Sequence, residues 1–100
     1  MFELNGKFFD WDNNKNMINI NKHGISFKEA ATVFFDTNAI EIDDIQHSQD
    51  ENRFLILGKS RKLRLMVVCH CYRENDAVIR IISARKAVNE EIEIYGGDEI

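Results

Sequence analysis

Hydrophobic and polar positions change their spacing near residue 39 of the chain. Before that point, apolar positions recur at helical spacing in two segments. Asp12 and Gly24 bracket the first segment as an N-cap residue and a terminating glycine, and Ser26 opens the second with a capping box completed by Glu29. We therefore predict two helices, one between Asp12 and Gly24 and one that begins at Ser26 and runs through Phe35.

Beyond residue 39 the apolar positions alternate or run together, which is typical of strands. The segments with this pattern are 39–43, 53–58, 63–72 and 78–83. Their short connections favour antiparallel pairing, and a last helix is expected over 88–95, stopped by Gly96-Gly97. The predicted fold is α+β in a single domain over residues 1–100, with two N-terminal helices, a four-stranded antiparallel meander sheet and a short C-terminal helix.

Composition narrows the function classes without naming one. The chain of 100 residues is 44% hydrophobic and has a net charge of −4, as a globular domain does. No segment approaches the roughly 18 apolar residues of a membrane helix, and residues 1–12 show no export pattern, so the cytoplasm is the expected location. P-loop, GxSxG, HExxH and dinucleotide-binding motifs are absent, which excludes most large enzyme classes.

The charge is unevenly distributed along the sequence. Residues 53–86 contain nine Lys and Arg against two acids, while the segments on either side are acidic. A basic band of this density attracts phosphates even on an acidic protein. Lys and Arg also protect exposed strand edges from aggregation, and composition alone favours this second interpretation.

Three arginines of the basic band are candidates for chemistry. Arg64, Arg80 and Arg85 lie within or next to apolar strands, and guanidinium groups bind phosphate bidentately and stabilise a phosphorane. A ribonuclease also needs groups that carry protons. The candidates for that role are His23, His47, His70 and Tyr95. In the alternative interpretation, these arginines pair with the abundant acids and only hold the sheet together.

Other chemistry-bearing residues have simpler explanations. Cys69 and Cys71 share one strand face and are expected to be reduced thiols, with His70 on the opposite face, so we predict no metal site. His23 precedes Gly24, where it can interact with the carbonyl groups that end the first helix. Glu91 and Tyr95 share a face of the last helix and are expected to dock that helix onto the sheet.

Several segments, spread from about residue 8 to residue 95, carry a family resemblance. They are Phe9-Asp10-Trp11-Asp12, Lys22-His23-Gly24-Ile25-Ser26-Phe27, Glu29-Ala30, Arg53-Phe54, Arg64-Leu65 and Arg80-Ile81-Ile82-Ser83-Ala84-Arg85. Together these segments resemble the BrnT family of toxins. The resemblance covers nearly the whole domain.

The resemblance implies a type II toxin with a RelE-like fold that cuts RNA without a metal or other cofactor and stops translation. It implies a BrnA-type ribbon-helix-helix antitoxin as partner, through which alone operator DNA is bound. It also implies catalytic roles for Arg64, Arg80 and Arg85. His23 becomes the first candidate for proton transfer. Candidates for substrate binding are Lys22, Arg53 and Lys62.

One segment departs from the family pattern. The last helix of the family is usually rich in arginine, whereas here the run is Asn89-Glu90-Glu91-Ile92-Glu93. Such an acidic helix repels RNA unless it faces away from it. The alternative function is therefore a catalytically weak or inactive module that binds the antitoxin and acts in operon co-repression. A third alternative is a domain that binds nucleic acid without cutting it.

Overall fold

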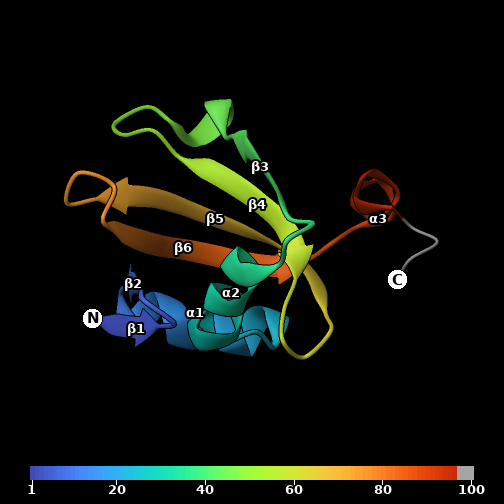
Figure 1. Ribbon diagram of the computed structural model, residues 1–100, viewed down its shortest axis with the longest axis horizontal. Helices are drawn as coiled ribbons and strands as arrows, with labels where there is room; N and C mark the ends of the chain where they lie inside the picture. The colour runs from blue at the N-terminus through green and yellow to red at the C-terminus, as the bar shows by residue number, and fades with distance from the viewer. Residues whose placement is uncertain (97–100) are drawn as a thin grey trace.

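The computed structural model describes residues 1–96 and contains a six-stranded mixed sheet with three α-helices in that range (Figure 1). In chain order the elements are β1 (Phe2–Leu4), β2 (Lys7–Asp10), α1 (Asn13–His23), α2 (Phe27–Thr32), the 3-10 helix η1 (Val33–Phe35), β3 (Ile40–Asp43), the 3-10 helix η2 (Ile45–His47), β4 (Phe54–Lys59), β5 (Leu65–Arg73), β6 (Val78–Lys86) and α3 (Asn89–Tyr95). None of the helices described is long and apolar enough to cross a membrane.

The helices begin and end where their capping residues place them. The Asp12 carboxylate accepts hydrogen bonds from the first amides of α1, and Gly24 ends that helix in the left-handed region at φ 69°. Ser26 Oγ accepts from the Glu29 amide at 3.1 Å, and α2 tightens into η1 after Thr32. α3 ends at Gly96 with φ 108°. The predicted second stop residue, Gly97, lies outside the described residues.

The predicted four-stranded antiparallel meander is wrong, because two N-terminal strands extend the sheet. Strands β3 to β6 pair antiparallel in sequence, but β1 and β2 form a hairpin and β2 pairs parallel with β6, which gives the order β1-β2-β6-β5-β4-β3. The turn of the hairpin is Asn5-Gly6, and both residues have positive φ. Asn-Gly between apolar positions is a strong hairpin signal that the sequence prediction did not use. The parallel pair is possible because α1 and α2 lie on the path between β2 and the rest of the sheet.

The core lies between one face of the sheet and the α1–α2–η1 layer (Figure 1). Its fully buried side chains come from all layers and include Phe9, Ile25, Phe27, Val33, Met66, Val68 and Ile81. We call this side the helix face and the other side the outer face. By strand register, the outer face carries Leu55, Val67, Cys69, Arg80 and Arg85.

An irregularity between β5 and β6 decides which arginines share a face. Cys69 pairs with Ser83, and the next residue, His70, pairs with Ile81, so Ile82 is an extra residue on β6. Side chains alternate along a regular strand, so two residues five apart would point to opposite faces. The bulge at Ile82 restores the phase, and Arg80 and Arg85 therefore lie on the same outer face.

Candidate nucleic-acid interface at the basic end of the sheet

Most of the basic side chains gather at one end of the sheet. β4 ends there, the turn to β5 lies there and β6 finishes beside them, while a hydrogen bond from Arg64 Nη2 to the Gly24 carbonyl at 2.9 Å brings the end of α1 to the same place. We call this region the basic end. Its members are Lys22, His23, Lys59, Arg61, Lys62, Arg64, Arg85 and Lys86. Arg64 and Arg85 form ion pairs. Within residues 1–96, the other basic side chains of this region form none: these are Lys22, Lys59, Arg61, Lys62 and Lys86.

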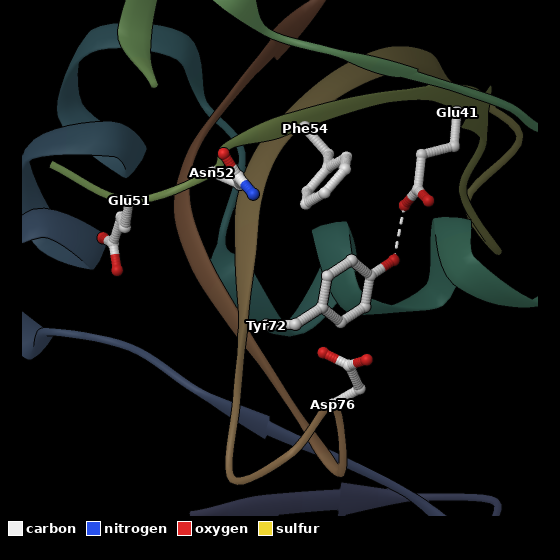
Figure 2. Close-up of a pocket in the computed structure, with 6 residues that line it drawn as sticks. All are labelled: Glu41, Glu51, Asn52, Phe54, Tyr72 and Asp76. Atoms are coloured by element: carbon white, nitrogen blue, oxygen red, sulfur yellow. Dashed lines mark hydrogen bonds between the residues drawn. The ribbon is translucent and has the colours of Figure 1, made fainter. Parts of the chain in front are cut away.

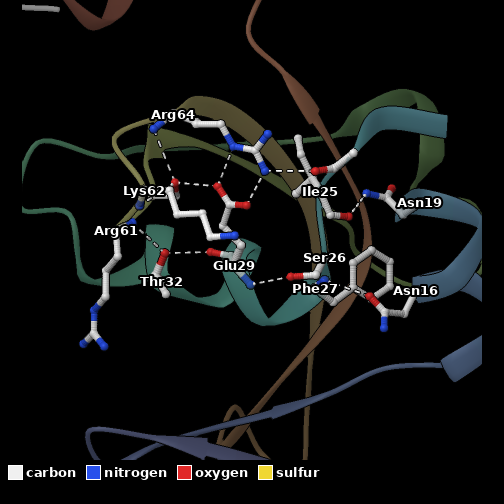
Figure 3. A network of polar contacts seen from close by, with 12 residues as sticks. Asn16, Asn19, Ile25, Ser26, Phe27, Glu29, Thr32, Arg61, Lys62 and Arg64 are labelled. Carbon is white, nitrogen blue, oxygen red and sulfur yellow. Dashed lines mark hydrogen bonds and ion pairs between the residues drawn. The ribbon is translucent and has the colours of Figure 1, made fainter. Parts of the chain in front are cut away.

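Arg64 is held by a buried carboxylate at the corner where α1, α2 and the β4–β5 turn meet (Figure 3). Its Nε donates to Glu29 Oε2 at 2.8 Å, and its Nη2 donates to Glu29 Oε1. Ser60 Oγ also donates to Glu29 Oε2 at 2.8 Å. The Glu29 side chain is 4% exposed and that of Arg64 is 32% exposed. Arg64 therefore joins three elements, and its Nη1 makes no hydrogen bond within the described chain.

Two asparagines of α1 hold the chain on the other side of this corner (Figure 3). Asn16 Oδ1 accepts from the Phe27 amide at 2.8 Å. Asn19 is buried, donates to the Ile25 carbonyl at 2.9 Å and accepts from the Ala84 amide on β6 at 3.0 Å. Several residues of the resemblance, Gly24 to Phe27 and Glu29 among them, therefore have structural roles at this corner.

The capping-box prediction for α2 is only half correct. The Ser26 side chain caps the helix as expected, but the Glu29 carboxylate turns to Arg64 and Ser60. This partner of Arg64 was missed in the sequence. A buried acid, 35 residues before its arginine, has no local pattern that reveals the pairing.

Arg80 and Arg85 are also paired with carboxylates. Arg80 Nη1 donates to Asp10 Oδ2 at 2.6 Å, across the parallel pair of β2 and β6. Arg85 donates through both terminal nitrogens to the two oxygens of Glu91 on α3, each at 2.8 Å. The three arginines thus make the acid pairs of the alternative interpretation. They do not form one cluster, because Arg64 lies on the helix face.

Only part of the predicted site is brought together. Arg80 and Arg85 stand opposite Cys71 and Val67 of β5, which separates them by about 13 Å along the sheet. Arg53 lies before β4, at the end of the sheet opposite the basic end, and its buried Nε has no hydrogen-bond partner among residues 1–96. Of the predicted residues, the basic end assembles Lys22, His23, Lys62, Arg64 and Arg85.

The candidates for proton transfer differ in their access to solvent. His23 is half-buried at the end of α1. His47 contacts Asp44 through Nδ1 at 2.9 Å, in the connection between β3 and β4. His70 is 0% exposed, so a substrate cannot reach it, and Tyr95 donates to Asp36 at 2.5 Å. His23 is therefore the accessible histidine of the basic end.

Both cysteines are free thiols on the outer face, and His70 points to the helix face. Burial raises the pKa of the Cys69 thiol to about 11, so it stays protonated at neutral pH. Within residues 1–96, no group of three or more His, Cys, Asp or Glu side chains is arranged to hold a metal ion.

Acid should weaken the fold through its paired carboxylates. Hydrogen bonds from Arg64 and from Arg85 hold the pKa values of Glu29 and Glu91 below their ordinary value of 4.5. The folded-state pKa is lowered, so this stabilisation is complete above about pH 4.5 and is lost as the pH falls through the lowered values. We expect the urea concentration at the unfolding midpoint, measured from pH 7 to pH 3, to fall once the pH is below about 4.5. This fall should be less steep in Glu91→Gln than in the wild type. The exposed neighbour provides the control, since Glu90→Gln should keep the wild-type slope; equal slopes in both variants would contradict the prediction.

Comparison with known proteins identifies the group to which these features belong. A family model described as "Ribonuclease toxin, BrnT, of type II toxin-antitoxin system" matches residues 11–91. The fold also resembles the 1.1 Å crystal structure of the Brucella abortus ribonuclease toxin BrnT, with a TM-score of 0.63 and 21% identity over 83% of this chain and 99% of that one. No curated protein matches the sequence significantly.

Proposed function

The chain belongs to the BrnT family of ribonuclease toxins of type II toxin–antitoxin systems, and from this premise we propose that it cuts RNA at the basic end of its sheet. The cleavage needs no metal, acts in the cytoplasm and stops translation. The observation that carries the proposal is the set of basic side chains around Arg64 and Arg85 that have no acid partner within residues 1–96.

These cations suit a polyanion even though the whole protein is acidic. Glu29 and Glu91 are bound to Arg64 and Arg85, and the lysines and Arg61 of the basic end form no ion pair within residues 1–96. Local potential, rather than net charge, attracts and orients phosphates. RNA bound here would place one phosphate at the Nη1 of Arg64 on the helix face and a neighbouring phosphate at the guanidinium of Arg85 on the outer face.

In the proposed reaction, the ribose 2′-oxygen attacks the adjacent phosphorus and the 5′-oxygen leaves. The attack builds negative charge on the phosphorane, and guanidinium groups held in place stabilise it without having to reorganise. Glu91 holds the Arg85 guanidinium by two hydrogen bonds, and Glu29 holds Arg64 in the same way. His23 accepts the proton of the 2′-hydroxyl and a proton is returned to the leaving 5′-oxygen, so the products are a 2′,3′-cyclic phosphate and a 5′-hydroxyl. Lys22 and Lys62 bind neighbouring phosphates.

The family implies an antitoxin that neutralises this activity. We propose that this partner is a BrnA-type ribbon-helix-helix protein and that operator DNA is bound only through it. A second function, an inactive module for antitoxin binding and co-repression, is favoured by one observation. Glu90 and Glu93 of α3 are exposed beside the basic end, where they oppose RNA.

Induced expression in a bacterial host tests which function applies. We expect growth arrest with loss of intact RNA, reversed when the antitoxin is expressed with the toxin, and cleavage by the purified protein that persists in a metal chelator. Normal growth with intact RNA, from protein shown to be folded, would overturn the ribonuclease proposal and favour the co-repression module.

A further inference from the structure

A second feature lies at the end of the sheet opposite the basic end. There the start of β4, the end of β5 and the β5–β6 turn surround a cavity of about 580 Å³ (Figure 2). Its lining residues are Glu41, Glu51, Asn52, Phe54, Tyr72 and Asp76, and we call it the acidic pocket. Nine residues of β5 separate it from the basic end, a distance of about 30 Å.

One wall of the acidic pocket is aromatic. The rings of Phe54 and Tyr72 meet edge to face, with centroids 5.3 Å apart. The Tyr72 hydroxyl donates to Glu41 Oε1 at 2.5 Å, as Figure 2 shows. Burial, together with this bond to Glu41, holds the pKa of Tyr72 well above its usual range, so the hydroxyl keeps its proton and remains a donor.

A buried histidine fixes the Glu41 carboxylate from behind. His70 Nε2 lies 2.7 Å from Glu41 Oε1, and its Nδ1 lies 3.0 Å from the Val68 carbonyl. Both ring nitrogens therefore lie within hydrogen-bonding distance of an oxygen acceptor. The ring also packs edge to face on Phe34, with centroids 4.7 Å apart. Glu41 Oε2 has no partner within residues 1–96, so a preorganised acceptor remains for a ligand.

The charge of the pocket selects its ligand. Three of its six lining residues are carboxylates, and none is Lys or Arg. Arg73 binds Glu51 at 3.1 Å, whereas Asp76 has no ion pair in the described chain. Such a site repels phosphates and attracts cations. A guanidinium fits both kinds of wall, because it binds carboxylates through paired N–H groups and stacks on aromatic rings.

A neighbouring hollow of about 430 Å³ shares Glu41, Tyr72 and Asp76 with the acidic pocket. Its other lining residues include Lys7 and the apolar residues Phe34, Ile56 and Ile79. The two hollows therefore form a groove with an anionic, aromatic end and an apolar end. This arrangement matches a peptide segment better than a free metal ion or polyamine.

We propose that the acidic pocket binds an arginine side chain of the antitoxin, with an apolar neighbour of that arginine in the adjoining hollow. The inference rests on the proposed function, since the family implies an antitoxin partner, and it adds the chemistry of the anchor. RNA and antitoxin would then hold opposite ends of the toxin. The charge of each end suits its own ligand.

The pocket is tested directly with the full-length toxin labelled with nitrogen-15 and two probes, N-acetyl-arginine methylamide and its neutral analogue N-acetyl-citrulline methylamide. We expect saturable NMR shifts at the amides of Asn52, Phe54 and Tyr72 with the arginine probe. The citrulline probe should bind at least about tenfold more weakly, because its hydrogen bonds are not charge-assisted. Equal binding of both probes, or shifts only at other residues, would overturn the proposal.

Two variants separate the carboxylates from the fold. Asp76→Asn keeps the turn, because Asp76 has φ 68° and asparagine tolerates this region. Glu51→Gln removes a carboxylate charge together with its partly exposed ion pair to Arg73. Each variant should lower the affinity for the arginine probe by about fivefold or more, and Glu90→Gln on α3 should leave that affinity unchanged. Unchanged probe affinity in Asp76→Asn would overturn the assignment.

The antitoxin encoded with the toxin provides the second arm. In the double variant Asp76→Asn/Glu51→Gln, its dissociation constant should rise at least about tenfold, while RNA cleavage by the free toxin stays at the wild-type rate. Wild-type antitoxin affinity would overturn the anchor and leave the ribonuclease proposal intact. If the wild-type protein does not cleave RNA, only the proposed ribonuclease function is overturned. If the wild-type toxin self-associates and Asp76→Asn abolishes this, the pocket is occupied by a second copy of the toxin. That result would overturn the proposal.

Discussion

Arg85→Ala is expected to lower RNA cleavage by the purified protein about a hundredfold, the usual effect of removing one preorganised group that stabilises charge in a transition state. Arg85 lies at the basic end, and two hydrogen bonds to Glu91 fix its guanidinium where the proposed reaction would build negative charge. Arg80 lies about 13 Å away along the sheet, so Arg80→Ala should act through binding of a neighbouring phosphate and lower cleavage only about tenfold. Cleavage of a labelled RNA, followed as initial rates, measures both effects.

Arg73 offers a matched control on the same outer face. It also pairs with a carboxylate, Glu51 at 3.1 Å, but stands at the end of the sheet away from the basic end. Arg73→Ala removes the same charge and a similar pair, and it should leave cleavage unchanged. All three pairs are partly exposed, so each variant should lose no more than about 1 kcal/mol of unfolding free energy. Full activity of Arg85→Ala, or equal loss in Arg73→Ala, would show that the basic end is not the site.

Local signals in the sequence were sufficient for much of this fold. Asp12, Gly24 and Ser26 place the ends of α1 and the start of α2, because a cap acts within one helical turn. The alternating segments place β3 to β6 in the same way. The N-terminal hairpin was also within reach, since Asn5-Gly6 lies between apolar positions. The parallel pairing of β2 with β6 was not, because it joins residues about 70 apart through tertiary packing.

The candidate site shows the same division between local and long-range information. The sequence supplied the arginines, but it did not supply the carboxylates that hold them. Arg80 and Arg85 share a face only because Ile82 is an extra residue in the pairing of β6 with β5, and no residue type marks this bulge. The position of Glu29 predicted that its side chain completes a capping box, whereas its carboxylate accepts hydrogen bonds from Ser60 and Arg64, 31 and 35 residues later. Spatial partners decide the electrostatics of each arginine, and spacing alone does not provide them.

Arg64 combines a structural role with the proposed catalytic one, and a pair of variants separates the two. Arg64→Met leaves the Glu29 carboxylate buried without its cation, so it should lower the free energy of unfolding by about 2–3 kcal/mol. This is somewhat less than for a fully buried pair, because the Arg64 side chain is 32% exposed. Adding Glu29→Gln removes the stranded charge and keeps an acceptor for Ser60 Oγ, so the double variant should recover most of the loss. Urea unfolding of both variants beside the wild type measures this.

Activity of the double variant then decides what Arg64 does in the reaction. Its fold is restored while the guanidinium is absent, so any remaining loss of cleavage comes from the chemistry or from phosphate binding. We expect cleavage to stay at least about tenfold below the wild type, because the Nη1 of Arg64 makes no hydrogen bond within residues 1–96 and so can donate to a phosphate. Recovery of full cleavage together with stability would make Arg64 a purely structural residue. Phosphate binding at this site would then depend on Arg85 and on Lys22 and Lys62, which form no ion pair within residues 1–96.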